Sequence, residues 1–233
     1  AESNGEEAQP RELLLAASLD EENGGITWQD VSGVVDPIAR HLQTKIWLFP
    51  MLNDQKRNDL YEQAIRAASR EVVRRSVVDN TSTIHSLDIG SGTGLLAMMS
   101  AKYLKESCVE SSIDCSVKVT SLEMSSAMAS VAKETVALNG FPPDSTELSS
   151  RDAFPVSVTV QEGHSCEILP VEEPKARLCT SELLESGLLG EGWLVAMRDA
   201  WLRHLDPKAI VVPQRARVFA QVVEGQGVTN YWG

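Results

Sequence analysis

The chain has 233 residues, enough for one full domain or for one domain and part of a second. Its 33 acidic residues outnumber its 21 lysines and arginines, so the formal net charge is −12. This charge argues against a general nucleic-acid-binding protein, because such proteins neutralise phosphates with clustered Lys and Arg. No apolar run approaches the ~18 residues of a membrane helix, so we expect neither nucleic-acid nor membrane contact.

The N-terminal part is acidic and then becomes helical in pattern. Residues 1–22 contain seven acidic residues and one arginine, and Asn-Gly and Gly-Gly breakers lie within residues 1–25. We therefore predict a mobile acidic leader over residues 1–30. From about Asp54 to Val78, apolar residues recur at three- and four-residue intervals, which predicts a helix capped by Asn53 or Asp54. Residues 31–80 are predicted to form an N-terminal helical region.

The central part alternates strand-like and helix-like segments. A strand over residues 84–89 runs into a glycine-rich turn, and a helical segment begins directly at Leu95. A polar insertion follows at about 106–116. Further strands are predicted over residues 117–122, 156–160, 176–180 and 209–212, with helices over 125–138 and 192–204. This order predicts a doubly wound, Rossmann-like α/β domain over residues 81–212.

The C-terminal part changes character after Pro213. Residues 215–223 have a strand-like pattern, but the sequence holds no further segment that could pair with them. We therefore predict that residues 213–233 begin a second, β-rich unit.

The four cysteines form no C-x-x-C pair and have no zinc-like spacing with the four histidines. We therefore expect no metal site and reduced thiols, as in cytoplasmic or nuclear proteins.

The glycine-rich turn has the pattern Gly90-x-Gly92-x-Gly94 and follows Asp88 directly. Glycines let the backbone bend sharply and let a ligand approach, and the helix after them offers free N–H groups. A dinucleotide and S-adenosylmethionine both use such a turn. Glu123, at the end of the next strand, could accept the hydroxyls of a ribose. The alternatives are a purely structural turn for the glycines and a solvated strand end for Glu123.

Two glutamates frame a loop that begins where a parallel strand should end. Glu182 and Glu191 are separated by a mostly apolar, glycine-interrupted stretch that could fold back as a hairpin. Paired carboxylates can hold a guanidinium in one orientation, because that group is planar, permanently charged and rich in donors. The alternative is that Glu191 merely starts the next helix, where the helix dipole favours an acid.

Three of these motifs resemble the protein arginine N-methyltransferase family. Residues 87–96 (LDIGSGTGLL) resemble its first cofactor motif, and residues 181–192 resemble its double-glutamate loop. Residues 51–54 (MLND), with Arg57 and Tyr61, are similar to its N-terminal helix. The stretches LLGEG and VPQRA are most similar to the type III subfamily, which makes monomethylarginine. The resemblance extends over roughly residues 47–223.

The resemblance implies specific roles for residues of this sequence. Glu182 and Glu191 would hold the substrate guanidinium during methyl transfer from S-adenosylmethionine, and Arg57 would bind the carboxylate of that cofactor. The other implied cofactor contacts are Asp88, Gly90 and Gly92 at the amino-acid end, Glu123 at the ribose, and Ser165 and Cys166 at the adenine. Without the resemblance, the preferred interpretations are a surface cation for Arg57 and a core thiol for Cys166.

The resemblance also implies a helical cofactor cover over residues 31–80 and the start of a truncated β-barrel at 213–233. Substrates would be arginine-containing proteins, Arg/Gly-rich or histone-like, and a dimer or pseudo-dimer would form through regions outside this sequence. The family's threonine-histidine-tryptophan loop is absent from the sequence, and Phe49 alone represents its usual aromatic pair. Two other functions stay open: a non-catalytic or truncated cofactor-binding module, and an NAD-type oxidoreductase that uses the same glycine turn.

Overall fold

The computed structural model describes residues 48–141, 155–170, 174–184, 188 and 190–219, together with two N-terminal strands. The chain divides into two compact units, residues 1–51 and 52–233. In the first unit, β1 (Leu15–Leu19) pairs with β2 (Ile26–Asp30) as an antiparallel hairpin. The acidic composition of residues 1–30 did not predict these strands. The rest of the predicted leader lies outside the described residues.

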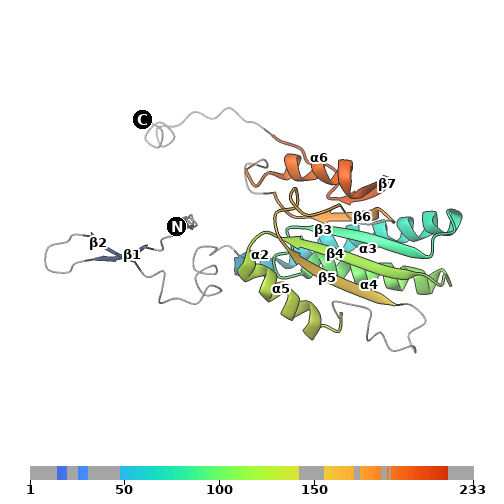
Figure 1. Ribbon diagram of the computed structural model, residues 1–233, viewed down its shortest axis with the longest axis horizontal. Coiled ribbons are helices and arrows are strands. Elements are labelled where there is room, and N and C mark those ends of the chain that lie inside the picture. The colour runs from blue at the N-terminus through green and yellow to red at the C-terminus, as the bar shows by residue number, and fades with distance from the viewer. Residues whose placement is uncertain are drawn as a thin grey trace, which may run out of the picture. The chain divides into compact units, whose positions relative to one another are not determined.

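The second unit is built on a five-stranded parallel sheet with the order β5-β4-β3-β6-β7 (Figure 1). The strands are β3 (Thr83–Ile89), β4 (Ser116–Glu123), β5 (Val156–Glu162), β6 (Ala176–Ser181) and β7 (Leu205–Val212). The helices are α2 (Leu48–Leu52), which crosses the boundary between the units, α3 (Gln55–Val78), α4 (Leu95–Glu110), α5 (Ser126–Leu138) and α6 (Trp193–Arg203). The predicted Rossmann-like α/β fold is confirmed.

Helices cover both faces of this sheet, as the doubly wound prediction requires. On one face, α3, α4 and α5 pack with β-branched residues of the strands; Ile65, Leu104 and Val119 belong to this core. On the other face, α6 packs Ala196 and Met197 against the neighbouring strands. The central strand β3 is buried at six of its seven positions, as expected of a parallel strand that is covered on both faces.

Two of the predicted helix starts are confirmed by their caps. The Asp54 carboxylate accepts a hydrogen bond from the Arg57 backbone N–H at 3.0 Å, at the start of α3. The Ser125 hydroxyl accepts one from the Met128 N–H at 3.4 Å, at the start of α5. Each satisfies a backbone donor that the first helical turn leaves without a partner.

The polar insertion predicted at 106–116 is wrong in its first half. α4 continues to Glu110, because Ser107 and Cys108 turn inward and are buried while their polar neighbours face solvent. The Cys108 sulfur lies 2.7 Å from that of Cys115, which is also buried. The spacing rules applied to the sequence did not identify this pair.

The structure shows no strand over residues 213–219, so the first half of the strand predicted at 215–223 is wrong. The rest of that segment lies outside the described residues. Val218 and Phe219 are exposed. Within the described part of the chain, no helix is both long and apolar enough to span a membrane.

Candidate functional site

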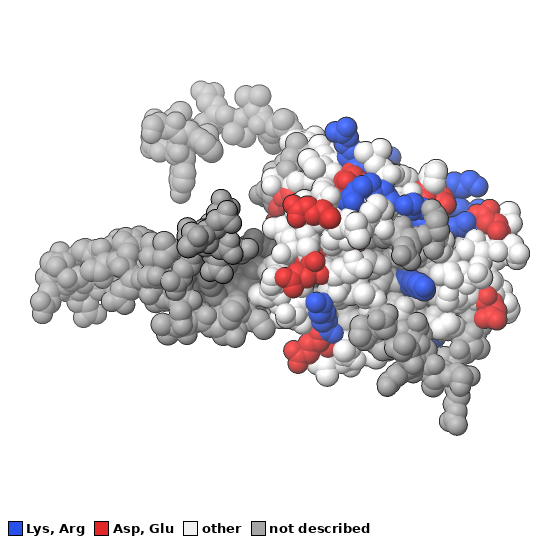
Figure 2. All heavy atoms as spheres, viewed as in Figure 1, with Lys and Arg blue, Asp and Glu red and all other residues white. Residues whose placement is uncertain are grey.

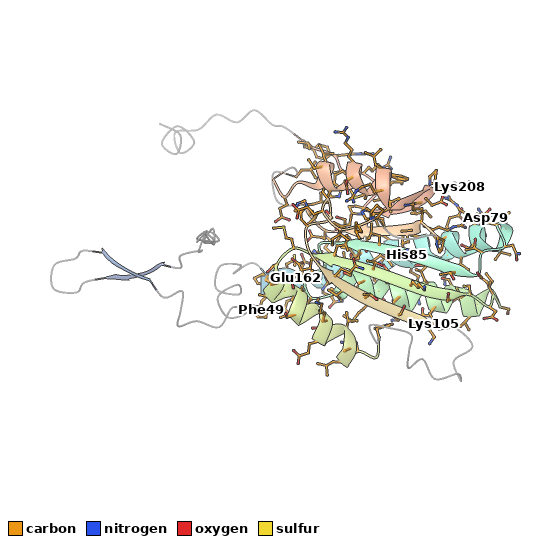
Figure 3. The ribbon with its side chains drawn as sticks, viewed as in Figure 1. Phe49, Asp79, His85, Lys105, Glu162 and Lys208 are labelled. Carbon is orange, nitrogen blue, oxygen red and sulfur yellow. The ribbon has the colours of Figure 1, made fainter. Side chains whose placement is uncertain are left out.

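The predicted site residues gather where the parallel strands end. Asp88 lies near the end of β3, Glu123 ends β4 and Glu182 directly follows β6. Figure 3 marks this edge with Glu162, the last residue of β5, opposite Asp79, which precedes β3. Acidic side chains predominate along the same left-hand edge in Figure 2. Ligands of open α/β sheets bind beyond the carboxyl ends of the strands, so this edge is the candidate site.

The glycine-rich turn after β3 is held down by Leu122, whose carbonyl accepts hydrogen bonds from Gly90 N at 2.9 Å and Ser91 N at 3.0 Å. Gly90, Gly92 and Gly94 all have positive φ. A Cβ on Gly90 would lie 2.7 Å from Leu183 Cδ2, whereas one on Gly92 would meet nothing within 4 Å. The turn therefore needs Gly90 for packing, and it presents Gly92 to open space, where a ligand could approach.

We expect Gly90→Ala to destabilise the protein and to weaken nucleoside binding at this edge. Its φ of +84° costs any other residue about 1–2 kcal/mol, and Leu183 must also move. Gly140→Ala is the matched control, because its φ is +82° and its Cβ would meet nothing within 4 Å. Thermal unfolding should show a loss in both variants. Titration with S-adenosylhomocysteine should show weakening in Gly90→Ala alone; equal affinities would contradict the expectation.

Asp88 is completely buried beneath this turn. Its two carboxylate oxygens accept hydrogen bonds from the hydroxyls of Ser121 and Thr180, both at 2.7 Å. Burial raises the pKa of Asp88 to about 6, although the two hydroxyl bonds act in the opposite direction. Asp88 was predicted from its place in the sequence, whereas its two hydroxyl partners were not. Their positions could have indicated this contact, since Ser121 and Thr180 each lie near the end of a strand that neighbours β3.

Glu123 is not a solvated strand end. One of its carboxylate oxygens accepts from Gly92 N and the other from Ser125 N, both at 2.9 Å. Its side chain therefore ties the glycine turn to the start of α5. Each carboxylate oxygen retains a further lone pair, so the hydroxyls of a ribose could still bind there.

Arg57 lies beside Glu182, with Nη2 3.2 Å from Oε2, and both side chains are about one-fifth exposed (18% and 20%). Its guanidinium stacks over the ring of Tyr61, 5.1 Å from the ring centroid, and Nη1 donates to Asn58 Oδ1 at 3.0 Å. Arg57 is thus mostly buried and paired at this edge of the sheet, which is not the environment of a surface cation. Its guanidinium has a partner on three sides.

Tyr61 lies one turn after Arg57 on α3, and burial raises the pKa of its hydroxyl above the ordinary value. The nearby carboxylates of Glu182 and Asp88 act in the same direction, against the effect of Arg57. Tyr61 belongs to the motif at residues 51–61, but no role was predicted for it. The four-residue spacing from Arg57, which places the two on one helix face, was the signal.

Ser165 and Cys166 lie in the turn that follows β5, at the same edge of the sheet. Gly163 N, at the start of this turn, donates to the Glu123 carbonyl at 2.8 Å. The Ser165 carbonyl accepts from Arg203 of α6 at 2.9 Å. Cys166 is partly exposed and is therefore not a core thiol. The predicted contact of Ser165 and Cys166 with an adenine is compatible with these positions and stays a prediction.

Glu191 is exposed and directly precedes Gly192, which caps α6. Residues 185–187 and 189 of the loop between the two glutamates lie outside the described residues. The convergence of Glu182 and Glu191 therefore stays a prediction. In the described part of the chain, no group of three or more His, Cys, Asp or Glu side chains is placed to hold a metal ion.

An apolar groove of about 580 Å³ lies between α3 and the end of β7. Tyr61 and Leu184 contribute to it, so it begins next to the Arg57–Glu182 pair. Leu60, Ala64 and Val212 form part of its walls. Its lining suits apolar groups, whereas the pair beside it suits charged ones.

Comparison with known proteins shows one consistent similarity. The chain is 33% identical over 182 residues to protein arginine N-methyltransferase 7 of Xenopus laevis, covering 78% of this chain and 22% of the relative. It is 34% identical over 177 residues to the Drosophila erecta protein of that name, and this match covers 75% of this chain and 21% of the relative. The chain thus spans about a fifth of the length of these relatives. No model of a known protein family matches it.

Among solved structures, the chain is similar to the Trypanosoma brucei PRMT1 enzyme–prozyme heterotetrameric complex with AdoHcy. The TM-score is 0.52 and the identity 23%, and the match covers 76% of this chain and 43% of that one. At this identity the similarity supports the fold alone.

Proposed function

Since this chain belongs to the protein arginine N-methyltransferase family, we propose that it binds S-adenosylmethionine and transfers the methyl group to a guanidino nitrogen of arginine in proteins, adding one methyl. One observation carries the proposal. Glu182, beside the buried Asp88 and the glycine turn, already binds a guanidinium, that of Arg57. A site that holds one guanidinium at this sheet edge has the chemistry to hold that of a substrate.

The residues at this edge fit the amino-acid and nucleoside parts of the cofactor. Asp88, once ionised, would pair with the ammonium group of the cofactor. The open side of Gly92 would leave room for the amino-acid part of the cofactor above the turn. Arg57 would bind the carboxylate. Glu123 would accept the ribose hydroxyls, and Ser165 and Cys166 would contact the adenine.

The bound cofactor would supply an electrophilic methyl group on its sulfonium. Glu182 and Glu191 would hold the non-attacking part of the substrate guanidinium, which concentrates positive charge there and leaves lone-pair density on the nitrogen that attacks. The nitrogen–methyl bond would form as the sulfur–methyl bond breaks, which would leave the sulfur as the neutral thioether of S-adenosylhomocysteine, and the nitrogen would then release its proton to solvent. Holding the two reacting atoms about 3–3.5 Å apart and in line can contribute on the order of 7–11 kcal/mol.

Incubation with labelled S-adenosylmethionine and an Arg-Gly-rich peptide tests the proposal. We expect label in the peptide, and mass spectrometry should find monomethylarginine without the dimethyl forms. S-adenosylhomocysteine should raise the melting temperature, because a ligand that binds only the folded state stabilises it, whereas NADH should not. Stabilisation without transfer would favour a non-catalytic cofactor-binding module, and stabilisation by NADH alone would favour an oxidoreductase. Substrate identity, dimer formation and a cytoplasmic or nuclear location stay predictions.

A further inference from the structure

We propose that Cys108 and Cys115 form a reversible disulfide, by exchange with a small disulfide such as oxidised glutathione, that ties the end of α4 to the start of β4. Both residues are free thiols, their sulfurs lie 2.7 Å apart, and the side chains are buried, with exposed fractions of 0% and 2%. The pair lies outside the candidate site, because β4 begins directly after Cys115 and ends at Glu123, at the opposite edge of the sheet. The proposal is therefore independent of the proposed function.

The fold holds the two sulfurs in contact. Cys108 lies in the last turn of α4, and both cysteines belong to the same hydrophobic core. The connection between them is fastened at two points: Ile113 N donates to the Cys108 carbonyl at 3.0 Å, and Ser116 N donates to the Ser82 carbonyl at 2.9 Å. Reduced thiols were expected from the cysteine spacing, which carries no information on a contact made by helix and strand packing.

The segment that covers the pair must open before an oxidant reaches it. Ser111, Ser112 and Asp114 are exposed, and Ser112 has a φ of +53°, which any residue other than glycine adopts at a cost. Burial raises the pKa of the Cys108 and Cys115 thiols, so the reactive thiolates form only when the segment opens. We therefore expect exchange that is slow and limited by local opening, unlike that of an exposed, acidic cysteine.

The exchange balances in two steps. The thiolate of Cys115, which ends the exposed turn, attacks one sulfur of oxidised glutathione, whose sulfur–sulfur bond breaks so that one glutathione leaves with the electron pair. The thiolate of Cys108 then attacks the Cys115 sulfur of this mixed disulfide, and the second glutathione leaves as the protein disulfide forms. The two thiol protons of the protein end on the two released glutathiones. The protein is thus oxidised by two electrons, and one glutathione disulfide is reduced.

The signature of this site is a disulfide that is more stable in the folded chain than in the unfolded one. Only six residues separate the cysteines, so the unfolded chain also closes the ring, and the excess alone reports the fold. For a ring of this size we expect an equilibrium constant about 30–100-fold larger in the folded chain. By the same linkage, oxidation should raise the melting temperature by about 5–10 °C.

Equilibration of the whole chain in mixtures of reduced and oxidised glutathione, with and without denaturing urea, measures this ratio. Trypsin cleaves after Lys105 and Lys118, so the peptide 106–118 carries both cysteines and neither of the other two. After quenching and alkylation, the oxidised peptide should be unalkylated and about 2 Da lighter than the unmodified reduced one. A folded-to-unfolded ratio near one would overturn the proposal. A native peptide that retains glutathione or two alkylated cysteines would also overturn it.

Cys115→Ala is the test variant, and Cys179→Ala is the matched control. Cys179 is as fully buried as Cys108, but its thiol donates to the Thr180 carbonyl at 3.8 Å. Oxidation should raise the melting temperature of Cys179→Ala as in wild type and leave that of Cys115→Ala unchanged, because the remaining thiol cannot close the ring. An equal rise in both variants would overturn the proposal, since another thiol would be its source. If Cys115→Ala does not fold, the peptide measurement on wild type decides.

Discussion

Glu182→Gln is expected to slow methyl transfer by about 10²–10³-fold while its affinity for S-adenosylhomocysteine is no weaker than that of wild type. Glutamine keeps the shape of the side chain but removes the charge that holds the substrate guanidinium. The interaction with a positively charged, correctly oriented nucleophile is lost, whereas the groups proposed to hold the cofactor stay in place. The loss should therefore fall on the chemical step.

Single-turnover transfer to an Arg-Gly-rich peptide, measured beside equilibrium titration of the cofactor, separates these two quantities. If both carboxylates hold the guanidinium, Glu191→Gln should also slow methyl transfer without weakening cofactor binding. A large effect at Glu182 with none at Glu191 would instead favour the interpretation in which Glu191 only starts α6. Equal losses in rate and in cofactor affinity at Glu182 would contradict its proposed role.

The fold was largely predictable because its signals are local. The Asp54 cap, the periodicity up to Val78 and the strand–glycine–helix order each depend on residues close together in sequence, and the structure confirms all three. The errors also have local causes. The end of α4 was misplaced because its last turn is polar on the outer side only, and burial of Cys108 on the inner side extends the helix.

The places of the candidate residues in the fold were predictable, but their contacts were not. Asp88 and Glu123 could be identified from their places at strand ends. The hydroxyls of Ser121 and Thr180 that fix Asp88, however, come from two other strands. The Arg57–Glu182 pair joins the first turn of α3 to the loop after β6, and only the assembled sheet brings them together. Sequence patterns carry no direct information on such pairings between distant segments.

The same burial that positions Asp88 leads us to expect that Asp88→Asn is more stable than wild type yet binds the cofactor poorly. The folded-state pKa of about 6 exceeds the ordinary 3.8, so the folded protein holds this proton more tightly than the unfolded chain does. Stability of wild type should therefore fall as pH rises from about 4 to about 6 and remain lower above that range. A neutral asparagine avoids this cost, which the pKa difference puts at up to about 3 kcal/mol at pH 7.

Cofactor affinity should show the opposite dependence on pH. Only the ionised carboxylate can pair with the ammonium group, so S-adenosylhomocysteine should bind wild type less tightly as pH falls below about 6. Asp88→Asn should bind weakly at every pH, with no inflection near that value. Urea unfolding and ligand titration between pH 5 and pH 8 measure both effects on the same samples. A variant that is less stable than wild type at pH 7 would show that the hydroxyl bonds outweigh the desolvation of the charge. If Asp88→Asn kept the wild-type pH profile of ligand binding, another group would cause that profile, and the ammonium group would have to bind elsewhere.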